Sequence, residues 1–138
     1  MEIKIFNNLP DEAYKIRTTV FCDEQGFVDE IDGIDSNATH FVVYYDKKAV
    51  ATCRVYFKDN KFILGRFAVL KEYRKMGIGH QLISSVEKFV KSKGYNLLIL
   101  HSQLRAVEFY QKCGYSTYGE IELEENHPHI WMKKLFDY

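Results

Sequence analysis

The chain has 138 residues, a formal net charge of zero and a sequence pI near 7.0, a balance that argues against an electrostatic nucleic-acid interface and against general attraction to a membrane surface. Hydrophobic residues make up 46% of the chain and aromatic residues 15%, which predicts a single compact domain, residues 1–138, with a substantial core. We therefore expect small molecules as partners, and neither nucleic acid nor a membrane.

The N-terminal segment and the cysteines indicate the cellular setting that we expect. Met1 to Lys4 begins no long apolar segment, and no stretch approaches the roughly 20 apolar residues of a membrane span. Cys22, Cys53 and Cys113 are widely spaced and form no Cys-x-x-Cys pair, so the sequence indicates neither a disulfide framework nor a zinc site. We expect a soluble, cytoplasmic protein.

The N-terminal half predicts a strand, a helix and a meander of strands. Residues 2–6 alternate as in a strand, and Pro10-Asp11-Glu12 opens a helix that runs to about Asp23. A loop follows over residues 25–37. The expected antiparallel strands are residues 40–45, 49–57 and 61–70, which are separated by short polar turns.

The C-terminal half predicts two helices and three strands. Residues 77–93 place apolar side chains on one helical face, with lysines near the C-terminal end and Gly94 as a stop. Residues 95–100 form a nearly continuous apolar run, as expected of a central strand, and residues 104–113 form a short helix that ends at Gly114. Two more strands are expected near residues 115–118 and 129–135. The predicted order is β-α-β-β-β-α-β-α-β-β.

A glycine loop lies between the last strand of the meander and the long helix. Its sequence is Arg74-Lys75-Met76-Gly77-Ile78-Gly79. Glycines let a ligand approach the backbone, and the free N–H groups and positive dipole end of a helix N-terminus favour phosphate. Arg74 and Lys75 add positive charge. Taken alone, a Gly-x-Gly before a helix is also typical of a turn and cap, so the pattern leaves both interpretations open.

Two further segments match one family at the expected distances from this loop. Residues 109–115, Phe-Tyr-Gln-Lys-Cys-Gly-Tyr, resemble the Phe-Tyr-x-x-x-Gly-Phe segment of the GCN5-related N-acetyltransferases (GNAT enzymes), whose acyl-CoA pyrophosphate loop has the pattern Arg-x-x-Gly-x-Gly. Residues 17–27 resemble the ElaA-like/YjcF-like branch of that family. The likeness to the branch extends to Glu30, Asp32, Asp35, His40, Glu124, residues 128–130 and Met132. The sequence departs from the branch at Ser102, where alanine is common, and at His127, where an apolar residue is usual.

The resemblance covers essentially the whole chain and implies a fold and a cofactor. The fold is α/β (α+β), a GNAT fold with a single mixed, mostly antiparallel central sheet of six to seven strands and flanking helices. The cofactor is acetyl-CoA (coenzyme A). The glycine loop would receive its pyrophosphate, strand backbone would pair with its pantetheine arm, and a short helix would flank the arm. The residues implied for these contacts are Phe67, Ala68, Val69, Arg74, Lys75, Met76, Gly77, Ile78, Gly79, His80, Gln103, Arg105, Ala106 and Phe109.

The implied reaction is the transfer of an acetyl group from acetyl-CoA to a primary amine by direct attack. Tyr110 matches the family position of the acid that protonates the leaving CoA thiolate, and a backbone N–H near Phe67 would stabilise the thioester oxygen. Glu24 and His129 match branch positions and are the candidate bases. The substrate residues implied are Glu24, His40, Arg66, Glu124 and His129. For each of these the interpretation as a solvated or structural group stays open, as does proton transfer through water.

Acidic residues gather in two segments, and the first of them, between Thr18 and Asp46, contains no Lys or Arg. If both segments meet at the acceptor entrance, they favour a small cationic amine such as a polyamine, a lysine-like amine or an aminosugar. A solvated loop face is the alternative. The acids concerned are Asp23, Glu24, Asp29, Glu30, Asp32, Asp35, Asp46, Glu120, Glu122, Glu124 and Glu125.

Other site types fit the sequence less well. A calcium loop over residues 29–35 fails, because Val28 would take the first ligand position and Thr39 the position of the bidentate glutamate. A dinucleotide loop would need a third glycine. The histidines near the C-terminus lack a cysteine or carboxylate at ligand spacing, so we expect no metal site.

Two questions stay open at this level. A GNAT-fold sensor or scaffold that holds acyl-CoA without turnover is the alternative function, and the fold alone does not separate it from an enzyme. Members of the family are often homodimers, but nothing in this sequence indicates a dimer. The acceptor and the preferred acyl chain are not named by any motif.

Overall fold

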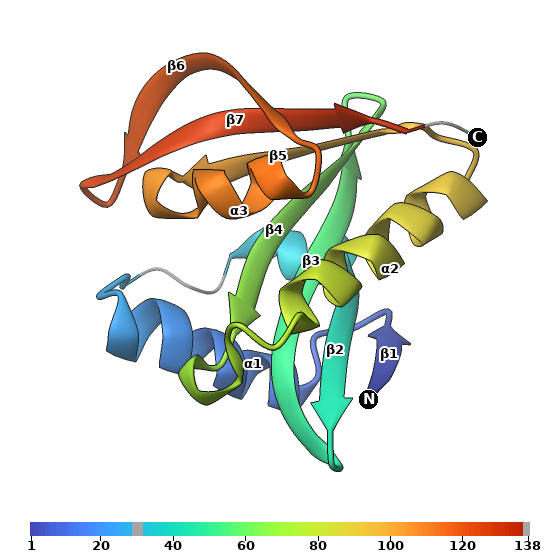
Figure 1. Ribbon diagram of the computed structural model, residues 1–138, viewed down its shortest axis with the longest axis vertical. Coiled ribbons are helices and arrows are strands. Elements are labelled where there is room, and N and C mark those ends of the chain that lie inside the picture. Colours follow the sequence, from blue (N-terminus) through green and yellow to red (C-terminus); the bar gives the residue numbers. More distant parts are fainter. Residues whose placement is uncertain (29–31, 137–138) are drawn as a thin grey trace.

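The computed structural model describes residues 1–28 and 32–136, which form one seven-stranded sheet with helices on both faces (Figure 1). The helices are α1 (Asp11–Arg17), α2 (Ile78–Ser92) and α3 (Val107–Lys112), with shorter turns η1 (Thr18–Glu24), η2 (Gly33–Asn37), η3 (Lys71–Tyr73) and η4 (Leu104–Ala106). The strands are β1 (Glu2–Phe6), β2 (Thr39–Tyr45), β3 (Lys48–Lys58), β4 (Lys61–Val69), β5 (Leu97–Gln103), β6 (Ser116–Glu124) and β7 (His127–Leu135). None of the helices in these described ranges is long and apolar enough to cross a membrane.

The sheet has the order β1-β2-β3-β4-β5-β7-β6. All neighbouring strands are antiparallel except β4 and β5, which are parallel because α2 connects them. The predicted fold class, a mixed and mostly antiparallel sheet with the element order given above, is confirmed.

The first helix changes character halfway. The predicted helix to about Asp23 starts as α1 and continues from Thr18 as the π-helical turn η1. The Thr18 hydroxyl donates a hydrogen bond of 2.9 Å to the Tyr14 carbonyl, a bond of the kind that bends helices. At the other end, Phe27 N–H donates to the Phe21 carbonyl over 2.8 Å. Wide turns of this type often occur at functional sites.

The C-terminal hairpin is longer than the sequence indicated. The strand expected near residues 115–118 extends to Glu124, and the strand expected from residue 129 begins at His127. The connection is the two-residue turn Glu125-Asn126, whose φ angles of 47° and 67° suit a tight hairpin. The acidic run in this segment did not indicate a strand. β6 lies at the edge of the sheet, where charged side chains are favoured because they discourage pairing with other chains.

Alternate residues of the central strands face different helices. Phe41 of β2 packs edge-on against Phe89 of α2, with ring centroids 5.6 Å apart. His40, the preceding residue, belongs to the other face, where its Nε2 lies 3.0 Å from the Asp35 carbonyl oxygen. The main core therefore lies between the sheet and α2, and α1 covers the opposite face. The buried apolar residues of α2 are Ile78, Leu82, Ile83, Val86 and Val90.

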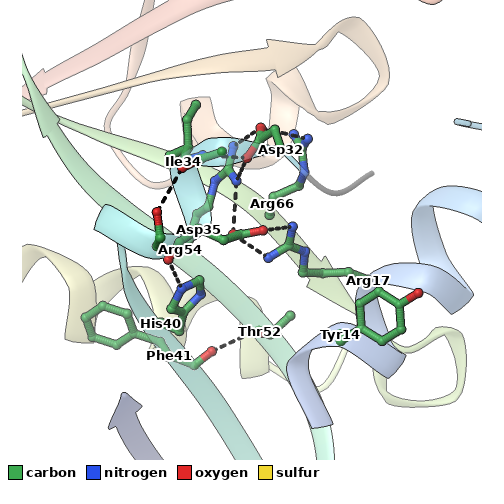
Figure 2. Close-up of polar contacts among 12 residues, drawn as sticks. Tyr14, Arg17, Asp32, Ile34, Asp35, His40, Phe41, Thr52, Arg54 and Arg66 are labelled. Carbon is green, nitrogen blue, oxygen red and sulfur yellow. Dashed lines mark hydrogen bonds and ion pairs between the residues drawn. The ribbon is translucent and has the colours of Figure 1, made fainter. Parts of the chain in front are cut away.

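A buried arginine–aspartate network, formed by Arg17, Asp32, Asp35, Arg54 and Arg66, lies on the α1 face (Figure 2). Arg17 donates two hydrogen bonds to Asp35, of 2.8 and 2.9 Å. Arg54 donates two to Asp32, of 2.7 and 2.9 Å, and a third to Asp35 of 3.1 Å. Arg66 lies 3.3 Å from Asp32. The network fastens η2 to α1, β3 and β4.

The electrostatics of the network keep both aspartates charged. Burial opposes ionisation of Asp35, but hydrogen bonds from Arg17 and Arg54 outweigh it and leave the pKa of this carboxyl below its ordinary value. Hydrogen bonds from Arg54 lower the pKa of Asp32.

Strands β4 and β5 separate partway along their length (Figure 1). They pair only where residues 62–64 face residues 98–100. Immediately after Leu64, β4 contains one residue more than its other neighbour: Gly65 pairs with Arg54 and Ala68 with Thr52. The bulge includes Arg66, whose φ of 50° is left-handed. A bulge bends its strand, which leaves the β5-facing edge of β4 unpaired from residue 65 onward.

Candidate active site

A cleft of about 1620 Å³ opens where β4 and β5 separate. One wall consists of β4 and the glycine loop, and the other of β5, β6 and β7, with α3 and η1 at the sides. Most of the residues predicted from the sequence line this one cleft: Glu24, Arg66, Phe67, Ala68, Val69, Arg74, Lys75, Gly77, Gly79, His80, Gln103, Arg105, Ala106, Phe109, Tyr110, Glu124 and His129.

Three predicted residues are not part of the lining. Met76 is exposed and Ile78 is buried in the core. At these two positions the predicted contact with the cofactor therefore concerns the backbone N–H groups and not the side chains. His40 is buried, and its ring contacts the Asp35 carbonyl within the arginine–aspartate network. Burial lowers the pKa of this imidazole. The structure thus places His40 beneath the sheet and away from the cleft.

The two glycines of the loop meet different physical needs. Gly77, which precedes the first residue of α2, has a φ of 79° and open space around its α-carbon. Gly79 lies against Phe109, and an added Cβ would come within 3.1 Å of that ring. Gly77 therefore allows the turn, and Gly79 allows close packing. Among the residues that the structure describes, no side chain caps α2, which leaves the N–H groups of its first turn available to an anion.

Arg74 ties the loop to the neighbouring segments. Its Nε donates to the Val69 carbonyl over 2.9 Å, and its two terminal nitrogens donate to the Glu24 carboxylate over 2.6 and 2.8 Å. These hydrogen bonds lower the pKa of Glu24 and raise that of Arg74. A carboxylate with a lowered pKa is a weak base, so the geometry favours a positioning role for Glu24.

Tyr110 lines the cleft and is 7% exposed. Its ring contacts Phe67 of β4 and Phe109 of α3, with centroids 5.9 and 5.1 Å apart. Burial raises the pKa of the phenol well above its ordinary value. The phenol therefore carries its proton at neutral pH, as a group that protonates a leaving thiolate must.

A histidine–glutamate cluster lies on the wall formed by β5, β6 and β7. Its members are His101, Glu122, Glu124 and His129. Oε1 of Glu124 is 2.6 Å from Nδ1 of His101, and Oε2 is 3.4 Å from Nε2 of His129. Nε2 of His101 lies 3.3 Å from Oε1 of Glu122. Within residues 1–28 and 32–136, no group of three His, Cys, Asp or Glu side chains is arranged to hold a metal ion.

Several lining residues were not predicted. His101 stacks on Trp131 with ring centroids 4.5 Å apart, and Gln25 accepts a 2.8 Å hydrogen bond from Gln103. Alternation along β5 gives the missed signal: His101 is two residues before Gln103, so both lie on the face that lines the cleft. The other unpredicted aromatic lining residues are Phe21, Phe27, Tyr56, Tyr73, Tyr118 and Trp131.

The family model described as "Acetyltransferase (GNAT) domain" matches residues 9–136. The chain belongs to the GNAT acetyltransferases. This membership confirms the predicted family, the enzyme class and acetyl-CoA as the cofactor.

Individual relatives agree with the family. The uncharacterized N-acetyltransferase YjcF of Bacillus subtilis is 36% identical over 126 residues, which cover 89% of this chain and 90% of YjcF. The crystal structure of Escherichia coli ElaA superposes with a TM-score of 0.83 at 25% identity, covering 96% of this chain and 98% of ElaA. An aminoglycoside 6'-N-acetyltransferase complexed with coenzyme A has the same fold, with a TM-score of 0.80 at 19% identity over 98% of this chain and 97% of that one.

Proposed function

We propose that this protein transfers the acetyl group of acetyl-CoA to a primary amine, with Tyr110 as the acid for the leaving thiolate. The observation that carries the proposal is the alignment of three features along one cleft: the uncapped start of α2, the unpaired edge of β4 and the phenol of Tyr110.

The free groups of this cleft suit the cofactor. The first-turn N–H groups of α2 would hold the pyrophosphate, and Lys75 and Arg105 add positive charge at the same end of the cleft. Residues 65–69 offer an unpaired strand edge to the pantetheine arm, although the Val69 carbonyl already accepts a hydrogen bond from Arg74. When bound, acetyl-CoA would supply the acetyl thioester, and CoA would be released as the free thiol.

The residues of the chain then have separate tasks. A backbone N–H at the β4 bulge, near Phe67, stabilises the charge that develops on the carbonyl oxygen. The Tyr110 hydroxyl gives its proton to the sulfur as the carbon–sulfur bond breaks, and the phenolate is reprotonated from the nitrogen that has formed the new amide bond.

Replacing Tyr110 by Phe tests this role. We expect kcat to fall by on the order of 10²- to 10⁴-fold, since a general acid is lost, while the Kd for acetyl-CoA stays nearly unchanged. Thiol release gives kcat, and calorimetric titration gives Kd. Tyr95→Phe is the matched control, because its phenol is exposed and does not line the cleft. Unchanged turnover of Tyr110→Phe would remove Tyr110 from the mechanism.

We further propose a small cationic acceptor, although the acids that support it are fewer than the sequence indicated. Glu24, Asp32 and Asp35 are all paired with arginines, and Asp29 and Glu30 lie outside the described residues. The support comes from Glu124 and Glu125, which line the cleft beside aromatic rings that attract cations. Those rings are Tyr56, Tyr118 and Trp131.

A pair of matched amines tests the acceptor class. We expect a diamine to exceed an amino alcohol of equal length in kcat/KM by about 5- to 30-fold, the equivalent of roughly 1–2 kcal/mol of cation recognition. Equal values for the two acceptors would contradict the cationic preference and leave the transferase activity itself intact.

A further inference from the structure

The wall of the cleft formed by β5, β6 and β7 carries a carboxylate in contact with two imidazoles. Glu124 lies between two imidazoles, which come from β5 and β7. Its carboxylate is half exposed, whereas both rings are largely buried. The exposed carboxylate thus connects the cleft with two largely buried imidazoles.

The hydrogen bonds of His129 fix its tautomer. Nδ1 lies 2.9 Å from the His127 carbonyl oxygen, which only accepts, so Nδ1 carries a proton. In the neutral ring Nε2 then holds a lone pair, and this nitrogen faces Oε2 of Glu124 at 3.4 Å. A proton taken up at Nε2 would therefore be stabilised at once by the carboxylate.

His101 holds the other oxygen of the same carboxylate. Its Nδ1 donates to Oε1 of Glu124 over a short 2.6 Å. Its Nε2 is buried and, within the described residues, has no hydrogen-bond partner. Glu122 approaches that nitrogen at 3.3 Å, but its Oε1 already accepts a hydrogen bond from Trp131 Nε1 over 3.2 Å. The stacked indole of Trp131 fixes the plane of the imidazole.

Other charged groups surround the cluster. Glu122 lies beside it on β6, and the neighbouring Glu125 accepts a hydrogen bond from Val28 N–H. Across the cleft the Tyr56 phenol lies close enough to both Glu124 and Arg66 to interact electrostatically with them. The ring of His127 stacks on Phe27, with centroids 4.3 Å apart, and the His127 backbone carbonyl contacts Nδ1 of His129.

We propose that His129, Glu124 and His101 form a proton relay that removes the proton of the acceptor ammonium. This inference rests on the proposed acetyl transfer. The ammonium N–H bond breaks and its proton passes, by way of Glu124, to Nε2 of His129, which frees the nitrogen lone pair to attack the thioester. His101 positions Glu124 and offers Nε2 as a second proton site. The relay later releases this proton to solvent, while the second nitrogen proton restores Tyr110.

Charge-removing variants of nearly the same shape test the relay. His129→Gln keeps a polar nitrogen near the position of Nε2, Glu124→Gln keeps the shape of the carboxylate, and His101→Asn keeps a donor near the position of Nδ1. We expect kcat/KM at pH 7 to fall on the order of 10²-fold for His129→Gln, with smaller losses for the other two. The losses of His129→Gln and Glu124→Gln should not multiply in the double variant, because the residues act as a unit.

The pH profile separates proton transfer from a structural role. The wild-type kcat/KM should rise between about pH 5 and 8, where imidazoles lose their proton, and this limb should flatten in His129→Gln. His127→Gln, the neighbouring histidine on the same strand, should keep the limb. An acceptor fluorinated next to its amine, which is already mostly neutral, should lose much less rate in the variants than the parent amine.

The outcomes distinguish the two proposals. A wild-type protein that releases no thiol with any amine would overturn the proposed function and the relay with it. A wild-type protein that turns over, together with a His129→Gln variant that binds acetyl-CoA normally and keeps the ascending limb, would overturn the relay alone. Independent multiplication of the single losses in the double variant would do the same.

Discussion

Two carboxylates in this chain each lie between two nitrogen-containing side chains, and these two kinds of side chain differ in whether they can release a proton. Asp35 lies between Arg17 and Arg54, and Glu124 lies between His101 and His129. A guanidinium does not lose its proton in a protein, whereas an imidazole does so near neutral pH. The arrangement around Asp35 is therefore fixed in charge, and the arrangement around Glu124 can change its proton content.

Burial reinforces this difference. The Asp35 side chain is 10% exposed and that of Glu124 is 50% exposed. The arginine–aspartate network fastens η2 against the sheet next to the β4 bulge (Figure 2), whereas the histidine–glutamate cluster lines the cleft. The identity of the partner and the access of solvent, more than the spacing of the atoms, separate a structural group from a reactive one.

Asp35→Asn is the strongest way to test the structural half of this comparison. The substitution removes the carboxylate that Arg17, which is 1% exposed, shares with Arg54, and breaking a buried pair in this way costs about 3–5 kcal/mol of unfolding free energy. Urea unfolding measures the loss. Glu124→Gln should cost less than about 1 kcal/mol, because the carboxylate is half exposed to solvent. Equal losses for the two variants would remove the basis of the comparison.

The pH dependence of stability sharpens the same prediction. The pKa values of Asp32 and Asp35 are lower in the folded chain, so their stabilisation is complete above the ordinary Asp value of about 3.9 and is lost as the pH falls through the lower folded values. His40 adds an earlier loss, because burial lowers its pKa and the unfolded chain takes up a proton first below about pH 6.5. In Asp35→Asn, urea midpoints should therefore depend less on pH below about 4 than in the wild type.

Much of the fold followed from local signals, and the exceptions have physical causes. The apolar periodicity of residues 77–93 predicted α2 to within one residue at each end, because the core selects that pattern directly. The alternating glutamates of β6 did not indicate a strand in the sequence, because the pairing of β6 with β7 and its place at the sheet edge are features of the tertiary structure. The change to a π-turn at Thr18 coincides with a hydrogen bond from the Thr18 side chain to the Tyr14 carbonyl, which composition does not indicate.

The site shows a similar division. The loop glycines and Tyr110 belong to contiguous motifs, and the structure brings them to one cleft. His40 belongs to the residues that resemble the ElaA-like branch, but it packs on the α1 face of the sheet, since alternation along β2 directs it away from the face of Phe41 and towards Asp35. Glu124 and its two histidine partners come from three different strands, so the cluster could be recognised only after the strand register was known.

A third carboxylate, Glu24, separates the two factors in the comparison, because it has an arginine partner like Asp35 and an exposure closer to that of Glu124. Its pair with Arg74 is 33% and 36% exposed. If exposure sets the energy, Glu24→Gln should change the unfolding free energy by no more than about 1 kcal/mol, and less in high salt. If partner chemistry sets the proton exchange, the ascending limb of the pH–rate profile should keep its position in Glu24→Gln, because the guanidinium lowers the pKa of this carboxylate further below the neutral range. A limb that moved in this variant while staying fixed in His129→Gln would assign the base to Glu24, the other candidate that the sequence offers. Urea unfolding of Glu24→Gln therefore tests the effect of exposure on stability. The pH profiles of kcat/KM for Glu24→Gln and His129→Gln test which of these two residues receives the proton.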